Sequence, residues 1–77
     1  MRGRRVLGHT LRTLREQAGL RTRELAARAK CSEGHIRNIE GGGDQPSNLL
    51  AHSIARVLGV GLDDFTELDD DEQRGAA

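Results

Sequence analysis

The chain has 77 residues, 12 basic and 12 acidic side chains, no net charge and a mean hydropathy of −0.62. This length allows one small domain and disfavours an enzyme with a deep pocket. No apolar run is long enough for a membrane span or a signal peptide, so we expect a cytoplasmic protein. The single cysteine, Cys31, cannot form an internal disulfide. One Phe without Trp or Tyr predicts an aliphatic core and an all-α fold.

Charge is distributed unevenly along the chain. Residues 1–30 hold nine basic and two acidic side chains, a net charge of +7, whereas residues 61–77 hold one basic and seven acidic side chains, a net charge of −6. The basic part is typical of a surface that binds a polyanion, and the acidic part either stays away from that surface or competes for it. A charged surface that only keeps the chain soluble is the alternative. Charge alone favours a nucleic acid only slightly over that alternative, so other residues decide the assignment.

The elements follow from apolar spacing and helix-end signals. Residues 1–5 predict a flexible basic arm, 6–68 a folded domain and 69–77 a disordered acidic tail. The domain begins with a helix that ends at Gly19 and carries an apolar stripe of Leu7, Leu11, Leu14 and Ala18. A second, short helix begins near Arg21 or Thr22, with Glu24 in its first turn and an inner face of Leu25, Ala26 and Ala29.

Two further helices and a final amphipathic turn follow. Ser32 is the expected N-cap of a third helix, whose buried edge is Ile36 and Ile39 and which ends at the glycines of residues 41–43. The dipeptide Pro46-Ser47 opens a fourth helix that ends at Gly59, with inward positions Leu50, Ile54, Val57 and Leu58. Leu62, Phe65 and Leu68 predict a last amphipathic turn, and no strand-like alternation of useful length is present. The sequence therefore predicts a compact five-helix bundle.

Several motifs occur in one register along the domain. They are L-x-x-L-R-x-x-x-G-L at residues 11–20, E-L-A-x-x-A at 24–29, S-x-x-x-I-x-x-I-E-G at 32–41, P-S at 46–47 and I-A-x-x-L-G-V at 54–60. This order resembles the Xre family of helix-turn-helix proteins, to which phage Cro and small phage repressors belong. The resemblance implies a lambda repressor-like DNA-binding domain. In that arrangement the third helix lies in the major groove of double-stranded DNA and the second helix crosses the phosphate backbone.

The helical register and the resemblance together give candidate DNA contacts. With Ile36 and Ile39 inward, the outward residues of the third helix are candidate base contacts: Glu33, Gly34, Arg37 and Asn38. Asn38 matches adenine, Arg37 matches guanine or a phosphate, and Glu33 matches the cytosine amino group. The plain alternatives are an acid favoured at a helix N-terminus for Glu33 and a solvated helix face for Arg37 and Asn38. Candidate phosphate contacts are Arg21, Thr22, Arg23, Ser47 and Asn48. Ordinary surface charge and helix capping are the alternatives for these five.

The resemblance also implies a structural ion pair, and this sequence differs from the family pattern at two places. It places Arg15 and Glu40 as a partly buried ion pair that joins the first helix to the end of the third. Thr22 stands where the family usually has glutamine, and the loop of residues 42–45 lacks the basic residues common there. Both departures reduce the expected contacts to the DNA backbone, for which the arginines of residues 1–5 are a candidate compensation.

The remaining residues predict no catalytic or metal chemistry. Cys31 and His35 are four residues apart, but no second pair with ligand spacing accompanies them, so we expect no metal and no cofactor. Ser47, His52 and Ser53 form no set of nucleophile, base and orienting group, and we do not expect an enzyme.

We predict a transcriptional regulator that binds double-stranded DNA sequence-specifically. We expect a small dimeric repressor that reads an inverted repeat with its third helix. One such domain reads only a few base pairs, so a homodimer is expected, with Leu62, Phe65 and Leu68 as its seam or as a simple cover of the monomer core. The alternative is a protein-interaction module of the same shape, antitoxin-like or antirepressor-like, that contacts a protein partner through its C-terminal segment and reads few bases.

Overall fold

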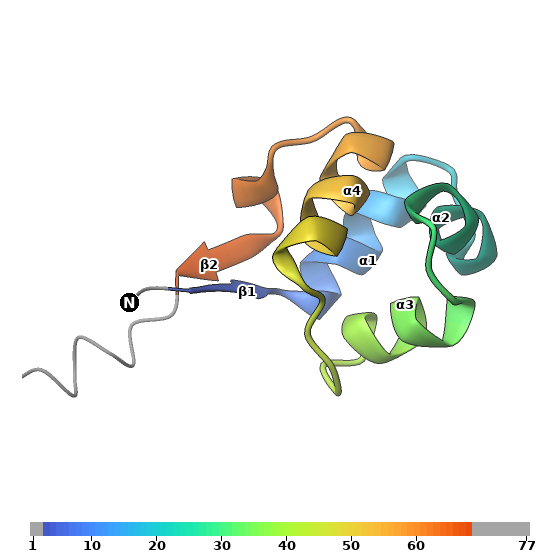
Figure 1. Cartoon of the computed structure of the whole chain (residues 1–77). Coiled ribbons are helices and arrows are strands. Elements are labelled where there is room, and N and C mark those ends of the chain that lie inside the picture. Colours follow the sequence, from blue (N-terminus) through green and yellow to red (C-terminus); the bar gives the residue numbers. More distant parts are fainter. Residues whose placement is uncertain (1–2, 69–77) are drawn as a thin grey trace, which may run out of the picture.

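The computed structural model describes residues 3–68, and in this part of the chain four α-helices lie beside a short two-stranded sheet (Figure 1). The elements in order are β1 (Arg4–Val6), α1 (Gly8–Gln17), α2 (Thr22–Ala29), α3 (Glu33–Glu40), α4 (Asn48–Leu58), the 3-10 turn η1 (Leu62–Asp64) and β2 (Thr66–Leu68). The four expected helices are confirmed, but the five-helix bundle is wrong, because the last segment forms a 3-10 turn and a strand. No helix between residues 3 and 68 is long and apolar enough to cross a membrane.

The first and last described segments pair as a two-stranded antiparallel sheet beside the helices. The paired residues are Arg4 with Leu68, Arg5 with Glu67 and Val6 with Thr66. Arg4 also forms an ion pair with Asp63, and Arg5 forms one with Glu67. The basic arm expected over residues 1–5 therefore differs from the structure, where Arg4 and Arg5 belong to β1 and face acidic partners. The acidic tail expected over residues 69–77 lies outside the described residues.

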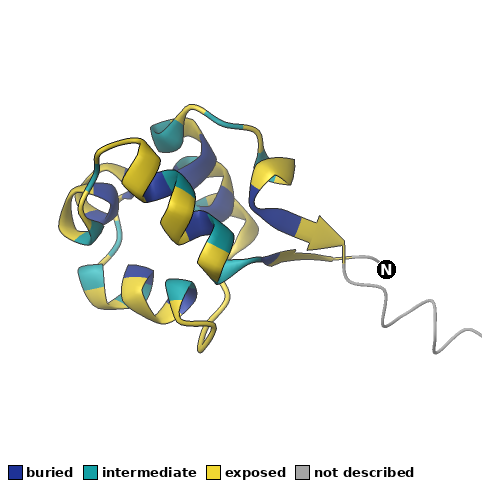
Figure 2. Cartoon of the chain, turned by 180° about the vertical axis from the view of Figure 1, so that it is seen from behind, coloured by how far each residue is buried: buried dark blue, intermediate teal, exposed yellow. Residues whose placement is uncertain are grey.

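The core lies between the four helices and includes residues of the C-terminal segment (Figure 2). Its largest fully buried side chains are Phe65, Leu11, Leu25, Ile36, Ile39 and Ile54. Burial of each such side chain stabilises the domain by about 1.5–3 kcal/mol relative to its exposed state. Small residues, Ala26, Ala51 and Ala55, are buried where helices approach each other, and α2 packs against both α3 and α4.

The C-terminal apolar residues do not share one environment. Phe65 is 0% exposed and belongs to the monomer core, so its expected place in a dimer seam is wrong. Phe65 belongs to the same buried cluster as Val6 of β1 and the inward residues of α1 to α4. Leu62 is half-buried against the same core, and Leu68 is 47% exposed.

Local signals fix both ends of the helices. The Ser32 hydroxyl accepts a hydrogen bond from the His35 amide (3.1 Å), and the Ser47 hydroxyl accepts one from the Leu50 amide (3.2 Å). Both serines are therefore N-caps, as the sequence predicts. Gly59 ends α4 in the left-handed region at φ +70°, where a side chain would be strained.

Two long-range contacts hold α3 and the following loop against the rest of the domain. A Cβ atom at Gly8 would overlap the Ile39 carbonyl oxygen and lie 2.5 Å from the Glu40 carbonyl oxygen. The start of α1 thus touches the end of α3 backbone to backbone. In the loop before α4, the Gln45 side chain accepts from the Val6 amide (2.7 Å) and donates to the Val6 carbonyl oxygen (3.1 Å). Gln45 pairs with the edge of β1 as a neighbouring strand would.

Candidate nucleic-acid interface

The turn between α2 and α3 sets the angle between these two helices. Lys30 ends α2 in the left-handed conformation at φ 64°, and the Cys31 amide donates to the Ala26 carbonyl oxygen (2.9 Å). Burial raises the pKa of the Cys31 thiol and so favours its protonated form. Ala26 is 3% exposed at the place where the two helices meet. A larger side chain there would push α2 and α3 apart.

The two faces of α3 differ sharply. Ile36 and Ile39 are 0% exposed, whereas Gly34, Arg37 and Asn38 are exposed on the opposite side of the helix. The Arg37 side chain is 68% exposed, and a Cβ atom at Gly34 would meet nothing within 4 Å. The face has open space at Gly34, and the side chains at residues 37 and 38 are donors of the kind that can hydrogen-bond base edges.

Glu33, the fourth residue expected on this face, already has two partners. Its Oε2 atom accepts from the Thr22 hydroxyl (2.8 Å) and from Arg37 Nη2 (2.8 Å). The hydrogen bond from Thr22 and the positive charges of Arg37 and Arg23 hold the pKa of this carboxyl below its usual value. Glu33 therefore links the first residue of α2 to the middle of α3 as an anion. The bond between Thr22 and Glu33 joins two residues that the sequence predicts as separate contacts to DNA, because residues on different helices show no common pattern in the sequence.

The expected phosphate contacts lie at two helix starts. Arg21 and Arg23 are exposed beside the start of α2, where Glu24 accepts from the Arg21 amide (2.8 Å), and they line one shallow hollow together. Ser47 and Asn48 are exposed at the start of α4. Their backbone amides and side chains are of the kind that bind phosphate oxygens at helix N-termini.

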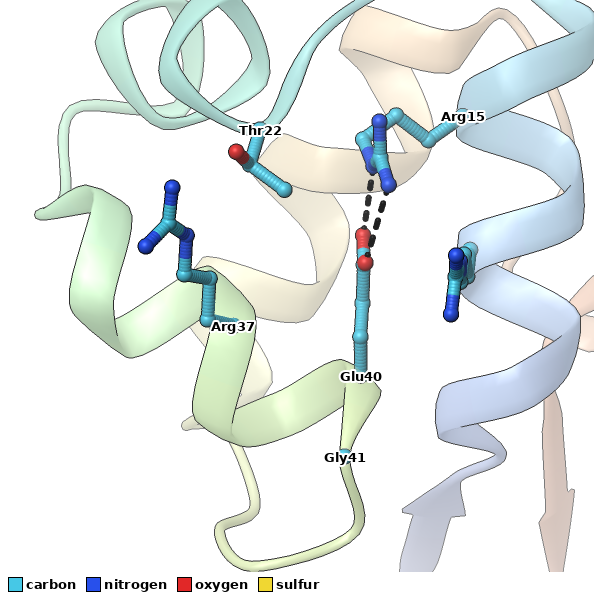
Figure 3. Close-up of a pocket in the computed structure, with 6 residues that line it drawn as sticks. Arg15, Thr22, Arg37, Glu40 and Gly41 are labelled. Atoms are coloured by element: carbon cyan, nitrogen blue, oxygen red, sulfur yellow. Dashed lines mark hydrogen bonds and ion pairs between the residues drawn. The ribbon is translucent and has the colours of Figure 1, made fainter.

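A cavity of about 310 Å³ opens between α1, α2 and α3 (Figure 3). The Arg37 guanidinium extends from α3 toward Thr22, while Arg15 and Glu40 face each other at its other side. The lining residues are Arg12, Arg15, Thr22, Arg37, Glu40 and Gly41. The sequence reasoning missed Arg12, because its place opposite α3 depends on how the helices pack.

Arg15 and Glu40 form the ion pair that the family register implies. Arg15 Nε and Nη2 donate to the two Glu40 carboxylate oxygens (2.7 and 3.1 Å), and Nη1 donates to the Leu20 carbonyl oxygen (2.9 Å). The side chains are only 11% and 7% exposed. The bonds to Glu40 outweigh burial and raise the pKa of Arg15, so the guanidinium is permanently charged. Three of its five N–H donors bind acceptors within the protein. The pair ties α1 to the end of α3.

Comparison with known proteins places the domain. The model of the helix-turn-helix domain matches residues 6–68. The crystal structure of the clp gene regulator ClgR from Corynebacterium glutamicum is 34% identical and superposes with a TM-score of 0.73, covering 75% of this chain and 62% of that chain. A second crystal structure of the same regulator gives 34% identity, a TM-score of 0.72 and coverage of 75% and 74%.

A third solved structure shares the fold at lower identity. The restriction-modification controller protein C.AhdI from Aeromonas hydrophila is 24% identical, with a TM-score of 0.73 and coverage of 75% of this chain and 88% of that chain. No curated protein matches the chain. The chain spans less than two thirds of the first ClgR structure.

Proposed function

Because the chain belongs to the helix-turn-helix family, we propose that it is a transcriptional regulator that binds double-stranded DNA sequence-specifically through α3. The observation that carries the proposal is the outer face of α3, where Gly34, Arg37 and Asn38 are exposed directly opposite the buried Ile36 and Ile39. A similarity to the regulator ClgR over three quarters of the chain supports the same class of function. Such a protein acts in the cytoplasm, at the nucleoid.

In this function α3 enters the major groove and its side chains contact base edges. Asn38 pairs with adenine through its amide, and Arg37 donates to guanine O6 and N7. Gly34 lets the groove floor approach the helix, since no side chain projects there. Each bidentate contact of this kind contributes about 1–3 kcal/mol of discrimination against the wrong base pair.

Phosphate contacts position the domain on the duplex. The exposed Arg21 and Arg23 lie at the start of α2, and Ser47 and Asn48 lie at the start of α4. These two helix starts present partial positive charge and free amides to the backbones on either side of the groove. Such contacts supply affinity without sequence preference and make it strongly salt-dependent.

The functional unit in this proposal is a homodimer on an inverted repeat. A single α3 reads only a few base pairs, and two half-sites centred about 34 Å apart place both copies on one face of the duplex. The half-exposed Leu68 and the half-buried Leu62 remain the seam that we propose. Phe65 supports this surface from within the core.

Selection from random duplex DNA, followed by binding measurements at several salt concentrations, tests the proposal. We expect an enriched inverted repeat and a fall of log affinity with log salt at a slope of about −0.9 per phosphate neutralised. Arg37→Ala should lose discrimination at one base pair. The matched control is Arg56→Ala, which removes an exposed arginine from the last turn of α4 instead of α3.

Two results would contradict the proposal. The first is a selection that enriches no duplex sequence together with an affinity that does not change with salt. The second is an equal effect of the Arg37 and Arg56 substitutions on every sequence, because a loss of that kind reflects overall charge and not base reading.

A further inference from the structure

An acidic side chain on a surface that approaches phosphates needs a physical explanation. Glu33 lies in the first turn of α3, next to the exposed Gly34. Unpaired, its charge would repel the DNA backbone at about the place where Arg21 and Arg23 attract it. One of the two hydrogen bonds to its Oε2 atom comes from Thr22, the first residue of α2, so the carboxylate is directed toward the start of α2.

The same carboxylate fixes the direction of Arg37. Glu33 and Arg37 are one helical turn apart and share a 2.8 Å bond through Nη2. An exposed arginine otherwise samples many rotamers, and that freedom has to be lost when it contacts a base. The planar guanidinium has further N–H donors beyond the one that Glu33 engages, so it can be held from one edge and still donate from another.

Thr22 supplies the fixed point of this arrangement. Its hydroxyl donates to the same oxygen of Glu33 at 2.8 Å, and Figure 3 shows the Arg37 guanidinium extending toward it. Thr22, Glu33 and Arg37 thus form a chain of contacts that begins on α2 and ends on the outer face of α3.

We propose that Glu33 is a positioning residue that contacts no base. Thr22 orients the Glu33 carboxylate, and Glu33 in turn sets sequence specificity by holding Arg37 toward one guanine. This inference rests on the proposed function and deepens it, because it replaces the expected contact between Glu33 and a cytosine amino group. Glu33 stays ionised throughout the neutral range, since its pKa lies below the usual value.

The test is a set of competition binding measurements on the selected duplex and its single-base variants. Arg37→Ala should reduce discrimination at one base pair by about 5- to 150-fold. Glu33→Ala should reduce discrimination at that same base pair, and in the Arg37→Ala background it should cause no further loss there. Because Glu33→Ala also removes a negative charge from the DNA-facing surface, affinity for nonspecific duplex should rise.

Two substitutions at Thr22 separate positioning from general packing. Thr22→Val removes the hydroxyl but keeps the shape, and it should lower discrimination at the Arg37 base pair. Thr22→Ser keeps the hydroxyl and should restore it. A purely structural role would lower affinity for all sequences alike, and thermal unfolding followed by circular dichroism shows whether each variant remains folded.

The possible outcomes separate this inference from the function on which it rests. If Glu33→Ala loses discrimination at a base pair that Arg37→Ala leaves intact, Glu33 reads a base directly and the inference is overturned while the function stands. Unchanged discrimination in Glu33→Ala also overturns the inference alone. If the unmodified chain selects no duplex sequence, the function and the inference fail together.

Discussion

Removal of Glu40 should destabilise the domain far more than removal of any exposed acid. In Glu40→Ala the Arg15 guanidinium loses two hydrogen bonds and keeps only the one to Leu20. Breaking a fully buried ion pair from one side costs about 3–5 kcal/mol. The pair is 11% and 7% exposed and borders a cavity of about 310 Å³ that gives water some access. We therefore expect the lower end, about 3 kcal/mol.

That loss is large for a domain of this size. A chain of 77 residues has a total stability of about 4–12 kcal/mol at the usual value per residue. A loss of about 3 kcal/mol lowers Tm by about 12–24 °C for a domain of this length. Urea unfolding followed by circular dichroism measures the free energy, and a thermal scan measures Tm.

Glu16→Ala is the matched control for Glu40→Ala. Glu16 pairs with Arg12 across 3.4 Å with both side chains more than half exposed, so its removal should cost only about 0.3–0.5 kcal/mol. The double variant Arg15→Met with Glu40→Leu should recover most of the loss, because it leaves no buried charge unpaired. If Glu40→Ala and Glu16→Ala differ by less than about 1 kcal/mol, the reasoning about burial is refuted.

Three further predictions concern backbone packing, base reading and pH. Gly8→Ala should destabilise the domain by about 1–3 kcal/mol or more, because its Cβ overlaps the Ile39 carbonyl oxygen, whereas Gly34→Ala, which meets open space, should stabilise α3 by about 0.5–1 kcal/mol; equal effects in urea unfolding would contradict this. Asn38→Ala should weaken specific binding by about 1–3 kcal/mol and spare nonspecific binding in a titration with both duplexes. Because the pKa of Glu33 is lowered on folding, its contribution to stability is present above the unfolded-state pKa and is lost as pH falls through the folded-state pKa. Acid should therefore destabilise the unmodified protein more than Glu33→Gln. If the free energies of unfolding in urea fall equally for both proteins as pH is lowered, Glu33 makes no such contribution.

The helices could be predicted because their signals are local. Ser32 and Ser47 cap the helices that follow them, and Gly59 ends α4 in the left-handed region. Ile36 and Ile39 lie one helical turn apart, so periodicity alone gave the buried edge of α3 correctly.

The two-stranded sheet could not be predicted in the same way. Each strand is three residues long, too short for alternation to be recognised, and Arg4 pairs with Leu68 at the opposite end of the domain. Phe65 was misplaced for a related reason. Apolar spacing shows that a residue needs to be buried, but it does not show whether its own chain or a second copy buries it.

The candidate site was predicted in its residues but not in its internal bonds. Arg37, Asn38 and Gly34 were identified from the helical register and lie on the exposed face of α3. The bond from Thr22 to Glu33 joins two helices, and its geometry depends on the turn at Lys30 and Cys31. Pairwise contacts of this kind depend on packing, which sequence periodicity does not describe.

A structure of the protein bound to its selected duplex tests the central claim most directly. The account predicts α3 in the major groove, with Asn38 and Arg37 within hydrogen-bond distance of base edges and Glu33 still bonded to Thr22. A complex in which α3 faces solvent or a protein surface, with no base edge within reach of Asn38 or Arg37, would contradict it.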